Sequence, residues 1–379
     1  MFPRPLIQMM MNSVAKLRNL VINLTRKLGK FRKVLTLGAL CCLAILVALG
    51  LTQWRDRSFI AGSGNLLRGA VEPAAAIEVS VVSEEPIQPI PLEIELDAAR
   101  VKLGDRLFHD PILSSDNTIS CASCHDLAQG GSDGLPTSIG MAGHQVPLNS
   151  PTVFNSGFQF RQFWDGRAAT LEEQVDGPVS AVGEMGGVSW QEVIFRLQEN
   201  PEYVRSFHRI YGGDITADQI RNAIATFERS LYTPNAPFDR YLRGDEEAIS
   251  AEAKQGYSLF KSYGCVTCHQ GVLLGGNMYQ TLGVFGDYFA DRGTPAIKAD
   301  LGRYNVTKDE NDKHVFKVPT LRNVALTSPY FHDGHAKSLD QAIKLMGKYQ
   351  LGVDMPQDDV DSIMQFLITL NGEYNGKTL

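Results

Sequence analysis

The sequences "CASCH", residues 121–125, and "CVTCH", residues 265–269, repeat one pattern, Cys-x-x-Cys-His. Cysteines three positions apart lie on the same side of a helical turn. Two such thiols can add to the two vinyl groups of one haem, and the adjoining histidine can serve as an axial ligand of its iron. The chain is therefore predicted to carry two covalently bound haem c groups.

Two other readings of paired cysteines fit less well. A thioredoxin-type disulfide would need a βαβ context, which is missing, and would not require the histidine. A zinc site built from both pairs would use all four thiolates, but the pairs are about 140 residues apart and each has its own histidine. The other two cysteines, Cys41 and Cys42, lie in an apolar run, so a disulfide framework is not expected.

The segments before the two motifs also repeat. Gly-x-x-Leu-Phe occurs at residues 104–108 and again at 256–260, each on an amphipathic pattern that runs into the cysteines. Further helical spacing occurs over 216–231, 338–347 and 357–370, and no strand pattern is as strong. Thr216 and Ser338 are predicted N-caps, with Gln219 and Gln341 three positions on completing capping boxes. The predicted fold is mainly α, with two cytochrome c-like helical haem domains and long loops.

The first 33 residues contain eight basic residues and no acidic one. Residues 34–54 are then apolar for about 20 positions, the length that a helix needs to cross a bilayer. This predicts a cytoplasmic tail over 1–33 and a transmembrane anchor over 34–54, with the body outside. A cleaved signal peptide, which would leave a soluble periplasmic body, is the alternative.

Prolines in residues 55–93 favour an extended linker. We expect the N-terminal haem domain over 94–245 and the C-terminal haem domain over 246–379. Removing the eight basic charges from the formal net charge of −6 leaves −14 for the rest of the chain. So acidic a body argues against nucleic acid as a partner and favours small neutral substrates or a protein with a basic docking face.

From about Leu96 to Leu370 the chain resembles the bacterial dihaem cytochrome c peroxidase family. The resemblance is carried by four segments: "ISCASCHDLAQGGSDGLPTSIG", "NSPTVFNSGFQFRQFWDGRAATLEEQ", "GPVSAVGEMG" and "VPTLRNVALTSPYFHDGHAKSLDQAIKLMG". It implies a cytochrome-c peroxidase that reduces hydrogen peroxide to water. The N-terminal haem would be the peroxidatic centre, and the C-terminal haem would receive the electrons.

The resemblance also implies which residues hold the haems. The first haem would be attached and ligated by Cys121, Cys124 and His125, and the second by Cys265, Cys268, His269 and the axial Met346. Taken alone, Met346 lies on the apolar face of its predicted helix, where a methionine is more often part of the core. The remaining histidines lack ligand spacing and are predicted to be structural or surface groups, and of these His332 is the one expected to lie nearest the second haem.

Three residues match functional positions around the peroxidatic haem of the family. Trp164 resembles the tryptophan that lies between the haems and assists electron transfer; core packing is compatible with that role. Glu184 would take the proton from the near oxygen of peroxide and deliver one to the departing oxygen, while Gln174 would orient the substrate. An ordinary exposed loop glutamate is the alternative for Glu184.

Asn149, Thr327 and Pro329 match the positions that bind calcium between the two domains of the family. They would supply one side-chain amide oxygen and two backbone carbonyls, with waters completing a shell of hard oxygen ligands. Sequence spacing alone gives no sign of this constellation, so the calcium prediction depends on the resemblance.

The chain departs from the family after "SIG", where many members have a histidine that caps the peroxidatic iron. Here that position is Met141, and the nearest histidine is His144. Three alternatives stay open: Met141 ligates the iron, His144 does so, or the iron is five-coordinate. Glycines on both sides of Met141 and Ala142 allow each of them.

The expected electron donor is a small periplasmic cytochrome c, a cupredoxin or a quinol-linked protein, and relatives often form homodimers. The expected location is the bacterial inner membrane, with the body in the periplasm. A dihaem electron-transfer protein is the first alternative function, and the retained Gln174 and Glu184 speak against it. A protein-modifying dihaem oxidase is the second, but a tyrosine replaces Met346 in that relative.

Overall fold

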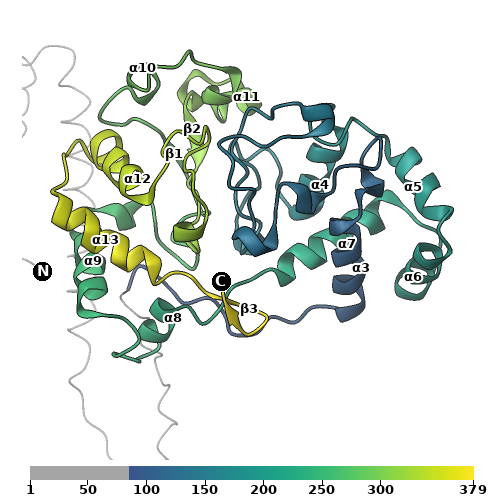
Figure 1. Cartoon of the computed structure of the whole chain (residues 1–379), viewed down its shortest axis with the longest axis horizontal. Coiled ribbons are helices and arrows are strands. Elements are labelled where there is room, and N and C mark those ends of the chain that lie inside the picture. Colours follow the sequence, from purple (N-terminus) through teal and green to yellow (C-terminus); the bar gives the residue numbers. More distant parts are fainter. Residues whose placement is uncertain (1–84) are drawn as a thin grey trace, which may run out of the picture. The chain divides into compact units, whose positions relative to one another are not determined.

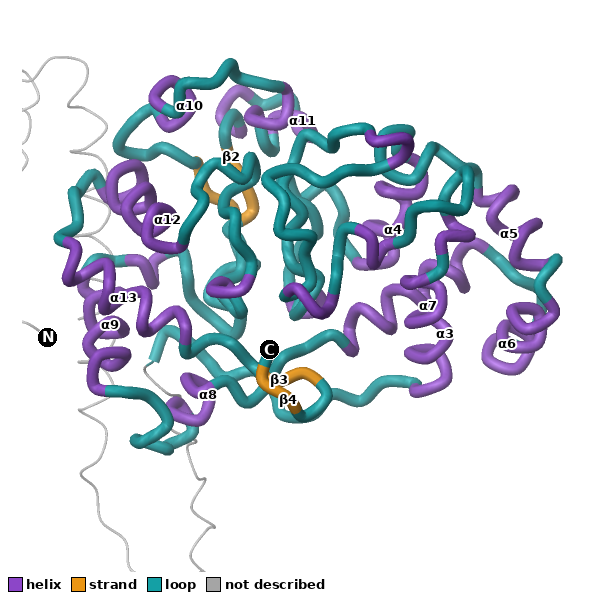
Figure 2. The backbone as a smooth tube through the Cα atoms, viewed as in Figure 1, coloured by secondary structure: helices purple, strands orange, loops and turns teal. Residues whose placement is uncertain are grey.

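The computed structural model describes residues 85–379 (Figure 1), which belong to one compact unit. The predicted tail and anchor, and the linker up to residue 84, lie outside these residues. Within the described part, no helix is long and apolar enough to span a bilayer. The structure is mainly helical, which confirms the predicted class, and long loops fill the space between the helices (Figure 2).

The helices fall into two groups that follow the chain order (Figure 1). The first half contains α3 (Ala98–His109), α4 (Leu171–Ser180), α5 (Trp190–Gln198), α6 (Pro201–Tyr211) and α7 (Ala217–Ser230). The second half contains α8 (Pro237–Leu242), α9 (Ala251–Ser262), α10 (Tyr288–Asp291), α11 (Tyr304–Thr307), α12 (Leu339–Met346) and α13 (Gln357–Ile368).

The repeated Gly-x-x-Leu-Phe helices pack in the same way in each half. Helix α3 packs on α7, and α9 packs on α13. A methyl group on Gly104 would overlap the carbonyl oxygen of Ala223, and one on Gly256 would overlap that of Ser362. The shared glycine is therefore the point where each helix touches the backbone of its partner.

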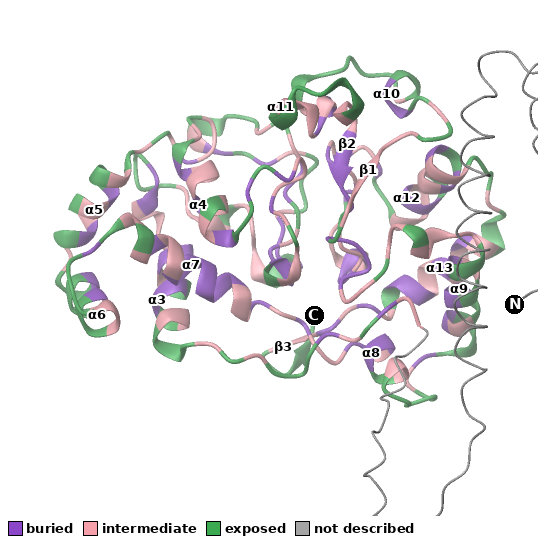
Figure 3. Ribbon diagram, turned by 180° about the vertical axis from the view of Figure 1, so that it is seen from behind, coloured by how far each residue is buried: buried purple, intermediate pink, exposed green. Residues whose placement is uncertain are grey.

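Each half has its own apolar core, and Figure 3 shows buried residues along both helix pairs. The first core joins α3 and α7 through residues such as Phe108 and Phe227. The second joins α9 and α13 through residues such as Phe260 and Phe366, and it includes Phe238 of α8. The second core thus includes a residue that precedes 246, the predicted start of the C-terminal haem domain. The domain limits over 94–245 and 246–379 stay a prediction.

The predicted N-caps are present, with one difference. Thr216 and Gln219 form the expected capping box at the start of α7. Ser338 accepts a hydrogen bond from the amide of Gln341, but the side chain of Gln341 accepts from Lys337 rather than from Ser338. The predicted start of α12 is confirmed. The return hydrogen bond of the capping box, however, comes from the amide of Lys337 and not from that of Ser338.

The end of the predicted linker is packed rather than free. Ile87 and Ile90 are fully buried, and Ile87 forms a bridge with Gly271 of the second half. Arg322 donates to the carbonyl of Gln88, so a buried cation also holds this segment. Apart from the bridge at Ile87, residues 86–91 form no helix or strand, and they pack on the second half.

Short strands that the sequence did not predict complete the fold. β1 (Tyr279–Thr281) pairs antiparallel with β2 (Val315–Lys317), and β3 (Glu373–Tyr374) pairs with β4 (Lys377–Thr378). Strand β2 also touches the first half, because the amide of Lys317 donates to the carbonyl of Trp164 over 2.8 Å. The ribbon of β1 and β2 therefore links the two halves.

Candidate functional site

The first Cys-x-x-Cys-His motif begins with the 3₁₀ turn Cys121–Ser123, which follows α3 and the 3₁₀ segment Pro111–Leu113 along the chain. The amides of Cys124 and His125 donate to the carbonyl of Cys121 over 3.2 and 3.0 Å. The Nδ1 atom of His125 lies 3.3 Å from the carbonyl oxygen of Gly131 and 3.3 Å from the hydroxyl of Ser150. These contacts orient the imidazole and leave its Nε2 atom for the predicted iron ligation.

The second motif repeats this geometry. The amides of Cys268 and His269 donate to the carbonyl of Cys265 over 3.2 and 2.9 Å. The Nδ1 atom of His269 lies 2.9 Å from the carbonyl oxygen of Leu274, which again leaves Nε2 for a metal. The two motifs are thus structural copies with the same ligand atom presented.

The chemistry of both motifs fits a covalently bound haem. All four cysteines are free thiols. Burial raises the pKa of Cys121 to about 12 and that of Cys265 to about 11, so the thiols stay neutral before attachment. Burial lowers the pKa of His125 and of His269, which favours the neutral imidazole that an iron ligand must be.

Met346 is the last residue of α12 and is half-buried. The apolar core of the second half includes its helix neighbours Ala342 and Ile343, but Met346 is not a member of that cluster of described residues. A π-helical turn, Gly347–Leu351, follows it directly. Met346 therefore does not have the core-packing role that helix spacing alone would give it. Its predicted ligation of the second iron is compatible with the structure.

The internal repeat shows a residue that sequence reasoning missed. Thr170 caps α4 as Ser338 caps α12, each through its side-chain oxygen. The residue eight positions after the cap is Met346 in α12, but it is Pro178 in α4. Because proline has no ligand atom, the first half lacks the counterpart of Met346. Comparing the two capped helices would have revealed this difference from sequence.

The two predicted pocket residues lie on and just after α4. Gln174 is four positions before Pro178 and so shares its helix face. Glu184 is half-buried, and burial raises the pKa of its carboxyl group against an opposing effect of Arg167. The charge of Glu184 also raises the pKa of Cys124, so this carboxyl group lies near the first motif.

The loop that contains Met141 and His144 packs on the segment around Glu184. The amide of Met141 donates to the carbonyl of Glu184 over 3.0 Å. The imidazole of His144 lies so close to Gly183 that a side chain there would overlap the ring. The sulfur of Met141 is 4.0 Å from the hydroxyl of Thr118. The structure therefore couples this loop to Glu184, while the choice among the three ligation alternatives stays a prediction.

Trp164 belongs to the first half and contacts the second. Its indole Nε1 donates to the carbonyl of Asn149 over 2.9 Å. Its ring meets His332 edge to face, with 6.4 Å between the ring centres, and it packs against the aromatic cluster that includes Tyr288 and Phe316. Trp164 thus contacts both halves, while its role in electron transfer between the haems stays a prediction.

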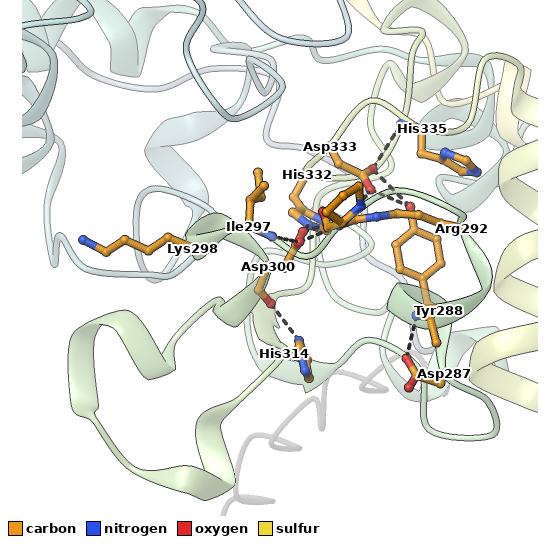
Figure 4. A network of polar contacts seen from close by, with 12 residues as sticks. Asp287, Tyr288, Arg292, Ile297, Lys298, Asp300, His314, His332, Asp333 and His335 are labelled. Atoms are coloured by element: carbon orange, nitrogen blue, oxygen red, sulfur yellow. Dashed lines mark hydrogen bonds and ion pairs between the residues drawn. The ribbon is translucent and has the colours of Figure 1, made fainter.

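A buried polar network supports the second-half side of this contact (Figure 4). The carboxylate of Asp300 accepts from His332 and from Arg292, each over 2.8 Å, and Arg292 also pairs with Asp333. The hydroxyl of Tyr288 donates to Asp333. Because each charged group faces a counter-charge, the network fixes the position of His332 beside Trp164.

The three predicted calcium residues lie in loops, and Asn149 is the one that touches this contact. The amide N–H of Asn149 donates to the carbonyl of His332, and its Nδ2 donates to that of Leu135, each over 2.8 Å. These bonds orient the Oδ1 atom of Asn149 as an available oxygen. Among the described residues, no group of three or more His, Cys, Asp or Glu could hold a metal. A cation here would therefore depend on neutral oxygens, such as Asn149 and the carbonyls of Thr327 and Pro329, which suits calcium.

The comparisons with known proteins agree with the two haem motifs. A family model described as di-haem cytochrome c peroxidase matches residues 98–247. The chain is 45% identical over 311 residues to the cytochrome c551 peroxidase of Nitrosomonas europaea, which covers 82% of this chain and 90% of that protein. The chain belongs to the di-haem cytochrome c peroxidase family, and it is a di-haem peroxidase whose cofactors are two haem c groups.

Two further similarities give the extent of the match. The chain is 52% identical over 290 residues to the cytochrome c peroxidase Ccp of Escherichia coli (strain K12), covering 76% of this chain. It spans 62% of the length of that relative. The fold is similar to the crystal structure of a MauG-like protein associated with microbial copper homeostasis, with a TM-score of 0.66 and 26% identity over 78% of this chain and 95% of that one.

Proposed function

We propose that the protein reduces hydrogen peroxide to water at its first haem, with electrons received through its second. The observation that carries the proposal is the difference between Pro178 and Met346. The helix that would give the first iron a fixed methionine has a proline there, with Gln174 on the same face and Glu184 nearby. When bound, the haem irons supply the electron-accepting and peroxide-reducing chemistry.

The residues of the pocket would move the protons. Reduction of peroxide requires a proton to leave the near oxygen and a proton to reach the departing one. Burial raises the pKa of Glu184, so its carboxyl group holds a proton at a higher pH than an exposed glutamate. Gln174 would orient the substrate by hydrogen bonds, and Trp164 would provide an aromatic ring between the two halves.

Steady-state turnover tests this proposal. The haem-loaded, calcium-supplied protein, given a reduced small cytochrome c, should consume hydrogen peroxide with two donor electrons for each peroxide. Turnover no faster than that of free haem would overturn it. A protein whose reduced spectrum does not respond to cyanide or peroxide would instead be a pure electron-transfer protein.

The electron donor and the location form a second part of the proposal. An anchor over residues 34–54 would hold the body at the periplasmic face of the inner membrane, beside quinol-linked donors as well as a soluble cytochrome c or cupredoxin. The acidic composition favours a donor with basic residues around its redox centre. The rate with such a donor should fall steeply with added salt, because salt screens exposed charges.

Calcium and self-association complete the proposal. Asn149, Thr327 and Pro329 would place a calcium ion beside the contact between Trp164 and His332. Chelation should therefore lower peroxide turnover and alter the haem spectra, and added calcium should restore both.

A homodimer is expected in solution, and sedimentation of the loaded protein measures it.

A further inference from the structure

Lys317 is a buried cation for which the described residues provide no partner. Its side chain is 6% exposed. Within residues 85–379 its ammonium group makes no hydrogen bond or ion pair. Burial lowers its pKa to about 7, and no neighbouring charge opposes that effect. The other buried cations differ: Arg322 lies 2.7 Å from Asp239, and Arg292 pairs with two carboxylates.

The position of Lys317 is defined by its strand. It is the last residue of β2, opposite Tyr279 of β1, and its amide donates to Trp164. Directly opposite residues of antiparallel strands point to the same face. The hydroxyl of Tyr279 donates to the carbonyl of Gly166 over 3.2 Å, so this face meets the first half.

The other face of the same ribbon meets the second haem motif. Gln280 is the next residue of β1, so its side chain points to the opposite face. Its Nε2 atom lies 3.8 Å from the sulfur of Cys268. Lys317 is thus separated from the second motif by the thickness of one ribbon, and it lies beside the backbone of Trp164.

An ammonium group in a protein interior is costly unless an anion compensates it. The described residues around Lys317 contribute no anion, but each haem c carries two propionate carboxylates. We propose that Lys317 is the counter-ion of a haem propionate at the boundary between the two halves. The inference rests on the two haems, and not on which substrate or donor the enzyme uses.

This contact would have two consequences. Reduction of a haem iron removes one positive charge, so a fixed ammonium group beside the propionate favours the reduced state. In addition, the backbone hydrogen bond from Lys317 to Trp164 would hold that propionate at a fixed place beside the tryptophan. Lys317 would therefore act as a positioning residue for electron transfer between the halves.

Redox titration of the haem-loaded protein tests the proposal. The variant Lys317→Met removes the charge at similar length, Lys317→Arg keeps it, and Lys102→Met removes a charge from an exposed position on α3. In Lys317→Met we expect the reduction equilibrium constant of one haem to fall about tenfold, which is about 59 mV for one electron. A shift of the methionine-ligated haem assigns the propionate to the second haem, and a shift of the other haem assigns it to the first.

Lys317→Arg should keep both potentials close to those of the starting protein. Potentials in Lys317→Met equal to those in Lys102→Met would overturn the proposal, as would an equal shift in Lys317→Met and Lys317→Arg. Haem content per chain is measured for each variant. If Lys317→Met does not retain two haems, Lys317→Gln replaces it as the uncharged variant, and potentials in Lys317→Gln equal to those in Lys102→Met would overturn the proposal.

Discussion

Pro178 and Met346 occupy the same position in two helices that begin with equivalent caps, Thr170 and Ser338. The repeat thus places a thioether at this position in the second half and a proline, which has no ligand atom, in the first. With Met346 as the predicted ligand, this difference would make the two haem sites unequal, since an iron with a fixed second ligand transfers electrons and an open one can meet a substrate.

Met346→Ala should convert the second haem into a site without its methionine ligand. Its potential should fall by at least about 100 mV, because axial ligands set haem potentials over about 0.8 V. Donor-driven turnover should fall with it, while the haem content stays at two. Spectroelectrochemistry measures this, with Met355→Ala as a control from the apolar cluster of the same half. Unchanged potentials in Met346→Ala would exclude its ligation.

Glu184→Gln should lower kcat for peroxide by about 10²- to 10⁴-fold, the range for a removed general acid–base group. Cyanide binding and both potentials should change little, because the haems stay in place. Glu199→Gln, at an exposed position after α5, is the matched control and should retain full activity. A variant with normal kcat would mean that another group moves the protons.

Gly104→Ala and Gly256→Ala should each destabilise the holoprotein by about 3 kcal/mol or more, since overpacking against a helix backbone leaves little room to relax. Gly213→Ala is the control, because its neighbourhood is open. Thermal unfolding monitored by the haem absorbance of each variant gives the comparison. An alanine at either position without loss of stability would contradict the close helix contact.

Glu228 gives a stability prediction that depends on pH. It is 6% exposed, its Oε2 atom has no hydrogen bond, and burial raises its pKa to about 8. Between the unfolded pKa of about 4.3 and this value, the native state binds a proton that the unfolded state does not. Its contribution to stability is therefore fully present below that range and is lost as the pH rises through it.

Glu228→Gln should remove this dependence. The variant should match the starting protein near pH 5 and exceed it in stability near pH 8, since the amide never has to ionise. Unfolding midpoints at the two pH values measure the effect, with Glu199→Gln as the exposed control. An equal pH slope in both proteins would show that Glu228 has a counter-charge in the loaded enzyme.

The sequence predicted those features that depend on residues close together in the chain. The two haem motifs, the Gly-x-x-Leu-Phe helices and the cap at Thr216 all depend on residues close together in the chain. The pairing of β1 with β2 was not predicted, because strands of three residues show too little alternation of polar and apolar side chains. The network around Asp300 was also missed, since Arg292, His332 and Asp333 meet only after the loops fold.

The segment that carries Glu85 shows where the chain joins its folded body. Glu85 pairs with Lys261 and contacts Tyr257, both on α9, before the chain crosses to the first half and forms α3. Any pull on the chain at residue 85 would therefore act first on α9, in the half that contains Met346.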